Sequence, residues 1–67
     1  MGRYYFDLQG AQNAKDSGGL AFEGDLEAFQ AAKRLATELA TARPSLRGNT
    51  WVVLTQKGAE DTYWIGV

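Results

Sequence analysis

Asp25–Ala42 has the sequence DLEAFQAAKRLATELATA, the longest regular pattern in the chain and the stretch that decides the fold. At about 100° per residue, its apolar and polar side chains separate onto opposite sides of a helix. The apolar side consists of Ala28, Phe29, Ala32, Leu35, Ala36, Leu39 and Ala42. The polar side consists of Glu27, Gln30, Lys33, Arg34, Thr37, Glu38 and Thr41. The stretch therefore predicts a helix with one buried face, whose alanines allow a close approach to the layer that it covers.

Both ends of this helix are marked in the sequence. Asp25 is an expected N-cap, because its carboxylate could accept a hydrogen bond from an unpaired backbone N–H one turn on. Pro44 disfavours helical geometry at Arg43, so we expect the helix to end at Ala42. Leu46, in the connection that follows, is expected to lie under the end of the helix.

Aromatic and β-branched residues predict four β-strands outside the helix. The predicted strands are residues 3–8, 20–23, 50–56 and 62–67. In the second strand we expect Leu20 and Phe22 on the core side, with Ala21 pointing outward. Residues 9–19 are rich in Gly, Asn, Asp and Ser, and they predict a mobile hairpin loop. Residues 57–61 predict a longer hairpin turn between the last two strands.

The order strand, strand, helix, strand, strand predicts a single small α+β domain over residues 1–67. If the helix runs back over the sheet, every neighbouring pair is antiparallel when the first strand lies between the second and the third. The predicted fold is therefore a four-stranded antiparallel sheet of order 2-1-3-4, with the helix packed on one face. The opposite face has no cover from the chain, and we expect the functional surface there.

Composition argues against several classes of function. The chain has 7 basic and 8 acidic side chains, so no overall field attracts a phosphate backbone or an anionic membrane. It contains no histidine and no cysteine, which excludes metal sites and disulfides built from them. No apolar run reaches the roughly 20 residues that span a bilayer, and the N-terminus lacks the layout of a signal peptide. We expect a cytoplasmic protein with no cofactor, no bound metal and no membrane contact.

Catalytic groups are equally sparse. Ser17, like the other hydroxyl residues, lacks the histidine of a serine-type triad, and the nearby Lys15 lies in the predicted mobile loop. Asp7 could form a carboxylate pair with Asp16 or Glu23 only if both groups were buried in a cleft. We therefore expect no enzymatic activity and no catalytic residue.

The aromatic residues exceed what the predicted core can hold. Both faces of the last two strands are apolar, whereas a sheet with one solvated face normally alternates apolar and polar residues. One set must point outward, and a shift of one residue in register would exchange the two sets. We expect the open face to carry Tyr5 with Trp51 or Trp64, and Arg3 or Lys57 nearby. These five residues are the candidate binding or interface residues.

These aromatics allow three interpretations. The tryptophans can complete the edges of a small core. They can form a protein interface, because Trp, Tyr and Arg are enriched where protein surfaces meet. They can also form a platform on which nucleotide bases stack, an interpretation that the near-neutral charge disfavours.

Three motifs are typical of one family. They are Arg3-Tyr4-Tyr5-Phe6-Asp7, Asp16 with Gly19, and Asp25-Leu26-Glu27-Ala28. In these motifs the chain resembles a family of short uncharacterised bacterial proteins that carry a domain of unknown function. It departs from the family at Gly2, where proline is usual, and at Phe29, where a small residue is common. The resemblance covers nearly the whole chain and implies the same order of elements, but no activity.

The hypothesis from sequence is a non-enzymatic protein–protein interaction module that forms a homodimer through its open sheet face or an edge strand. A chain of this size buries only about 60% of its unfolded surface, so association would add stability. One alternative is a nucleic-acid or nucleotide binder that uses the exposed aromatics. Another is a regulator or inhibitor of a larger partner enzyme, suggested by a weaker architectural likeness to antitoxin-type modules.

Overall fold

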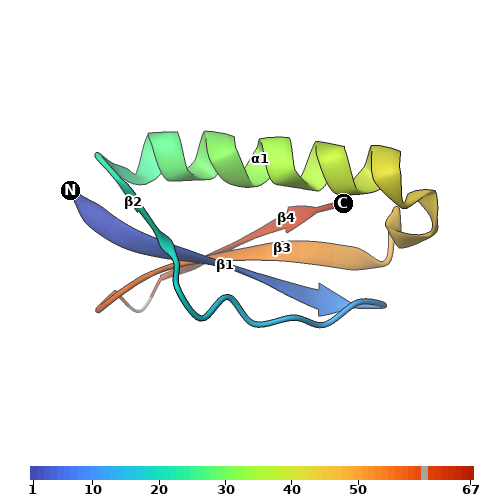
Figure 1. The fold of residues 1–67 in the computed structure, drawn as a ribbon, viewed down its shortest axis with the longest axis horizontal. Coiled ribbons are helices and arrows are strands. Elements are labelled where there is room, and N and C mark those ends of the chain that lie inside the picture. The colour runs from blue at the N-terminus through green and yellow to red at the C-terminus, as the bar shows by residue number, and fades with distance from the viewer. Residues whose placement is uncertain (60) are drawn as a thin grey trace.

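The computed structural model describes residues 1–59 and 61–67, and it shows a β-sheet with a helix along one face (Figure 1). The elements in chain order are β1 Gly2–Gly10, β2 Leu20–Phe22, α1 Asp25–Ala42, the 3-10 turn η1 Pro44–Leu46, β3 Thr50–Gln56 and β4 Thr62–Gly66. The strands form one antiparallel sheet in the order β2-β1-β3-β4. The predicted α+β fold, its strand order and the bounds of its helix are confirmed.

Alternation along the strands decides which side chains face α1. Phe6 of β1 lies directly opposite Leu54 of β3, and both are on the helix side of the sheet. The ring of Phe22 packs edge-on against the rings of Tyr4 and Phe6, each with a centroid separation of 5.8 Å. The core consists of Tyr4, Ala28, Ala32, Ala36, Val52 and Leu54, with Phe6, Leu8, Phe22, Leu35, Leu39, Ile65 and Val67 packed against it.

The alanine side of α1 lies closest to the sheet. Ala28 and Ala32 are fully buried and Ala36 nearly so, which confirms the close approach that small side chains allow. The buried face is narrower than predicted, because Phe29 lies at its flank and is 36% exposed. Ala42 is exposed in the last turn, so its predicted burial is wrong.

The N-terminus of α1 also differs from the prediction. The N-cap is Gly24 in extended geometry, and no side chain of the described residues caps this end. Asp25 is already the first helical residue, and its carboxylate accepts a hydrogen bond from the Tyr4 hydroxyl at 2.5 Å. A buried hydroxyl needs a partner, and that need decides the position of this carboxylate. Glu27 instead accepts the N–H of Glu23 at 3.1 Å, on the N-terminal side of the helix.

The connections after α1 follow the expected pattern. The helix ends at Ala42, where the Arg43 N–H still donates to Leu39 O at 2.8 Å. Leu46 is buried beneath this end, as predicted. Of the predicted turn 57–61, residue 60 lies outside the described residues. Gly58 in this turn has φ +83°, a left-handed geometry that glycine adopts without strain.

Strand β2 departs from its prediction in one respect. Leu20 lies directly opposite Tyr4 and therefore on the helix side, but it is 57% exposed. It stands on the outermost strand, where α1 gives it no cover, so the expectation that Leu20 lies in the core is wrong. Phe22, on the same side and nearer the start of α1, packs against the core as predicted.

Candidate functional site

The face of the sheet opposite α1 carries both tryptophans. Trp64 lies opposite Val53, and Trp51 lies opposite Gly66, so the register places both indoles on the side away from Val52 and Leu54. The question that the sequence left open is therefore answered in favour of the open face for both indoles.

The two tryptophans contact each other. Their rings are edge-on, with centroids 6.5 Å apart and an angle of 69° between the planes. Trp51 is 39% exposed and Trp64 is 55% exposed. Val53 lies on the same face, directly opposite Trp64 and two positions from Trp51, and is only 4% exposed. We call Trp51, Val53 and Trp64 the tryptophan patch. It forms a small apolar surface on the side of the sheet that has no helix.

The other three candidate residues lie at the far end of the same face. Tyr5 lies opposite Thr55, four positions along β3 from Trp51, a distance of roughly 13 Å. The Arg3 guanidinium is engaged within the chain, because its Nη1 donates to Gly18 O at 2.7 Å. Lys57 follows β3, and its backbone N–H donates to Arg3 O at 2.8 Å. The predicted group is therefore divided into a tryptophan patch and a separate basic end.

The outer edge of β1 is covered along its length by the segment that was predicted to be a mobile loop. Beyond β2, the N–H of Phe6 donates to Asp16 Oδ2 at 3.1 Å. Leu8 and Ala14 exchange two backbone hydrogen bonds of 2.8 and 3.1 Å, and Asn13 Oδ1 accepts the N–H of Gly10 at 3.3 Å. Residues 11–19 thus lie along β1 with one bridge between Leu8 and Ala14. Gln9 and Gly10, predicted to lie in the loop, instead belong to β1, where they pair with β3.

Asp16 holds this covering segment in place. Its Oδ1 accepts the N–H groups of Gly18 and Gly19 at 3.2 and 3.0 Å, in addition to the Phe6 bond. These backbone donors hold the pKa of the Asp16 carboxyl below its usual value, with Gly19 the largest cause. The Asp16 N–H itself donates to Asp7 Oδ1 at 2.9 Å. The two carboxylates that could have formed a catalytic pair are therefore engaged in backbone hydrogen bonds.

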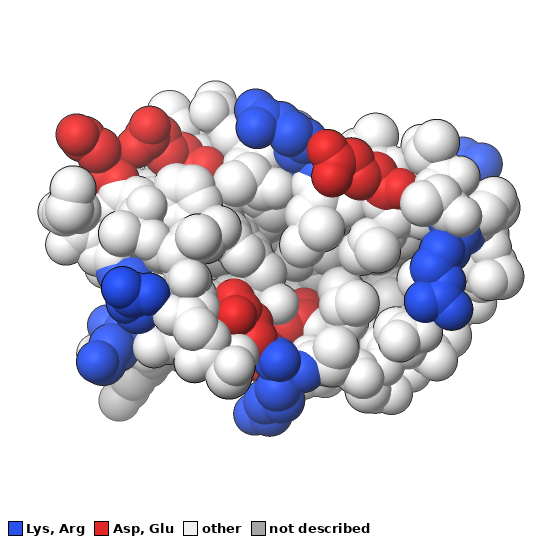
Figure 2. Space-filling model, in the orientation of Figure 1, with Lys and Arg blue, Asp and Glu red and all other residues white. Residues whose placement is uncertain are grey.

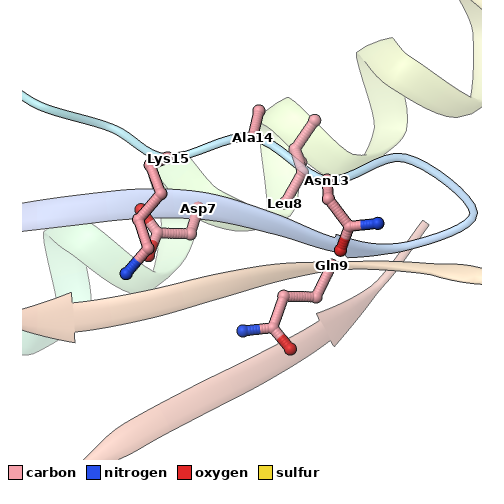
Figure 3. Close-up of a pocket in the computed structure, with 6 residues that line it drawn as sticks. All are labelled: Asp7, Leu8, Gln9, Asn13, Ala14 and Lys15. Atoms are coloured by element: carbon pink, nitrogen blue, oxygen red, sulfur yellow. The ribbon is translucent and has the colours of Figure 1, made fainter.

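A shallow hollow lies between β1 and this segment. It is lined by Asp7, Leu8, Gln9, Asn13, Ala14 and Lys15. Leu8 points toward α1 while Asp7 and Gln9 point to the other side of β1 (Figure 3). Asp7 already accepts the Asp16 N–H, so the hollow presents little free chemistry to a ligand.

An apolar groove lies on the other side of β4, next to the helix. It is lined by Leu26, Phe29 and Tyr63 with Asp25 at its rim, and the rings of Phe29 and Tyr63 are edge-on at 6.3 Å. Leu26 is 70% exposed and Tyr63 is 42% exposed. The sequence analysis did not identify this groove, although Leu26, an apolar residue outside the predicted buried stripe, was a signal for it. We call it the helix-side groove.

The one strongly shifted pKa near this groove belongs to Tyr4. Its hydrogen bond to the Asp25 carboxylate, assisted by burial and by the negative charge of Asp25, raises its pKa to about 12. Tyr4 is almost fully buried and its hydroxyl already has a partner. The shift is that of a structural hydrogen bond rather than of a catalytic group.

The distribution of charged side chains does not indicate a class of ligand. Acidic and basic side chains are interspersed over the face in Figure 2. One acidic group lies over the start of α1, whose first turn contains Asp25 and Glu27. Among residues 1–59 and 61–67, no three Asp or Glu side chains come together as a metal site would require. No helix in the described ranges is long and apolar enough to cross a membrane.

The comparisons with known proteins agree with the family resemblance. Residues 3–59 match the Domain of unknown function (DUF6894). No curated protein matches the chain. No solved structure matches it either.

Proposed function

The chain belongs to the DUF6894 family, which defines no activity, and we propose from its surface that it is a non-enzymatic protein–protein interaction module that self-associates. The tryptophan patch is the observation that carries this proposal. Two partly exposed indoles beside a buried valine on an uncovered sheet face are unusual for a sheet that remains in water. Exposed apolar patches of this kind typically mark contact surfaces, and tryptophan is among the residues most enriched there.

The surroundings of the patch support a protein partner. Trp51 is flanked in the register by the uncharged Gly66 and Gln9, and Val53 by Asp7, whose Oδ1 already accepts the Asp16 N–H. Protein interfaces combine such a patch, poor in charge and rich in aromatics, with a polar rim. The small size of the chain adds a reason for association, since a core of this size rarely supplies more than about 5 kcal/mol by itself.

Light scattering coupled to gel filtration tests the proposal. We expect the chain to be a dimer at high micromolar concentration, and we expect Trp51→Ala to weaken the dimer at least tenfold, because the substitution removes exposed apolar area without touching the core. Leu20→Ala is the control, since Leu20 is also a large apolar residue and is 57% exposed, against 39% for Trp51, but lies on β2 at the other edge of the sheet. A wild-type chain that is monomeric at all concentrations would contradict the proposal.

Base stacking is the second candidate, and the exposed indoles are the observation that favours it. Nucleic-acid binding would also need a basic side chain beside the two indoles. Arg3 does not lie there, because it donates to Gly18 O at the far end of the sheet. Titration with short single strands at low salt, followed by tryptophan fluorescence, separates the two functions. Quenching that saturates at micromolar strand would favour nucleic-acid binding, and unchanged emission would remove it.

A further inference from the structure

Strand β4 presents an outward row of backbone hydrogen-bonding groups to which no residue within 1–59 or 61–67 bonds. The Val67 N–H donates to Thr50 O at 2.9 Å, so the pair Thr50 and Val67 is a hydrogen-bonded pair between the two chain segments of β3 and β4. Because hydrogen-bonded and non-hydrogen-bonded pairs alternate in an antiparallel ladder, Ile65 and Tyr63 direct their N–H and C=O toward β3. Thr62, Trp64 and Gly66 therefore direct theirs away from the sheet.

The two edges of the sheet differ in how far they are protected from pairing with another strand. On the β1 side the outermost strand, β2, has only three residues, and beyond it the outward groups of β1 bond to Asp16, Ala14 and Asn13. Strand β4 has none of the features by which proteins protect an edge, since its sequence TYWIG has no charge and no proline, and its pairing with β3 has no bulge. It also has an apolar surface on each side, the tryptophan patch on one face and the helix-side groove on the other.

We propose that β4 pairs with β4 of a second copy in antiparallel orientation, about a twofold axis at Trp64, to form one continuous sheet across two chains. This proposal rests on the self-association proposed above and specifies its geometry. Trp64 then lies opposite Trp64 of the second copy, and Thr62 lies opposite Gly66 of the second copy. Among antiparallel registers, this is the one in which all three outward residues of each strand find an outward partner.

The side chains on both faces agree with this register. On the open face the two tryptophan patches join across the axis, and directly opposed aromatic pairs stabilise antiparallel strands. On the helix side Tyr63 lies opposite Ile65 of the second copy, next to the Leu26 and Phe29 side chains of the helix-side groove. A standard interface takes roughly 800 Å² from each partner, which would be less than a fifth of the 4466 Å² that one chain exposes.

The charges near the ends of β4 are complementary in the same register. Asp61, just before β4, lies opposite Val67 of the second copy. In each chain Arg47 lines one hollow together with Gly66 and Val67. Each end of the paired strands therefore brings a carboxylate of one chain toward a guanidinium of the other. A second copy fits this edge better than an unrelated strand, because the complement is already encoded in the chain itself.

Cysteine cross-linking tests the register directly, since the chain has no cysteine of its own. Residue pairs such as Thr62 and Gly66 of the second copy would have Cα atoms about 5.5 Å apart, a separation that a disulfide spans. A Cβ added at residue 66 meets no atom within 4 Å in the single chain. An equimolar mixture of Thr62→Cys and Gly66→Cys chains should form covalent dimers under mild oxidation at least tenfold faster than either variant alone.

Each variant alone is the internal control. Two Thr62→Cys residues would be offset by four positions, roughly 13 Å, which no disulfide spans. Equal cross-linking in the mixture and in the single variants would overturn the β4 pairing, as would equal cross-linking in a mixture of Thr62→Cys with Thr41→Cys on the exposed side of α1.

Thr62→Pro distinguishes association through the edge of β4 from association through the open face of the sheet. Thr62 is the first residue of β4 and its N–H points outward, so proline removes an edge donor without removing a bond to β3. We expect its dimer dissociation constant to rise at least tenfold, with circular dichroism and melting temperature at monomeric concentration unchanged. A dimer that Trp51→Ala weakens but Thr62→Pro does not would overturn the edge pairing and leave the interaction module standing. A wild-type monomer would overturn both.

Discussion

At the scale of single residues, the roles of Asp16, Gly19 and Asp25 in the three sequence motifs are structural rather than chemical. Asp16 binds three backbone N–H groups, and Asp25 accepts the Tyr4 hydroxyl. Gly19 has φ +69°, and a Cβ added there would lie 2.7 Å from Tyr4 O and 3.0 Å from the Tyr5 ring. These residues close one edge of the sheet and fix the start of α1. None of them belongs to the tryptophan patch.

The tight fit of Gly19 gives the first stability prediction. Gly19→Ala should lower the free energy of unfolding by about 1–2 kcal/mol, because alanine disfavours positive φ and its methyl group would collide with backbone. Gly18→Ala is the matched control, since a Cβ at the neighbouring residue 18 meets nothing within 4 Å. Urea unfolding of both variants measures the difference, and equal stability of the two would contradict the explanation.

The Tyr4–Asp25 hydrogen bond predicts a response to alkaline pH. Because the pKa of Tyr4 is raised to about 12 in the folded chain, the neutral phenol stabilises the fold. This contribution is complete below the ordinary tyrosine pKa of about 10 and is lost as pH rises toward 12. The unfolding free energy of wild type should therefore converge on that of Tyr4→Phe over this range. A difference that stays constant with pH would show that the hydroxyl contributes nothing through its ionisation.

At the scale of elements, α1 both covers one face of the sheet and fixes the distance between helix and sheet. Its three buried alanines bring the backbone close to the sheet, so added volume has nowhere to go. Ala32→Leu should lower the free energy of unfolding by about 1–3 kcal/mol through overpacking. Ala42→Leu, in the exposed last turn, should change it by less than about 0.5 kcal/mol. Thermal or urea unfolding of the pair checks the prediction, and similar losses in both would mean that helix propensity rather than packing decides.

The elements were largely predictable from sequence because their signals are local. The apolar stripe defined Asp25–Ala42, proline ended it, and the runs of aromatic and β-branched residues defined β3 and the start of β4. The covering segment was not predictable in the same way. Its order comes from Asp16 bonding to Phe6 across ten positions, and glycine, asparagine and serine give no local sign of such a contact.

At the scale of the whole molecule, prediction of the site was partial. The open face and the five candidate residues followed from alternation, but their distances from one another depend on register, which composition does not fix. The structure therefore separates Tyr5, Arg3 and Lys57 from the tryptophan patch. The predictions of an N-cap at Asp25 and of a core position for Leu20 were wrong for a similar reason. The Asp25 carboxylate bonds to the distant Tyr4, and the burial of Leu20 depends on how far α1 extends over the sheet.

The closed edge along β1 has a consequence for assembly. A sheet with two open sides could add chain after chain and grow into a fibre. Within the described residues, the groups along β1 are taken up by the chain's own β2 and covering segment, so a union through β4 would use the remaining side of each chain. Growth would then stop at two copies. The nine residues 11–19 that lie along β1 would thus limit the assembly to two copies.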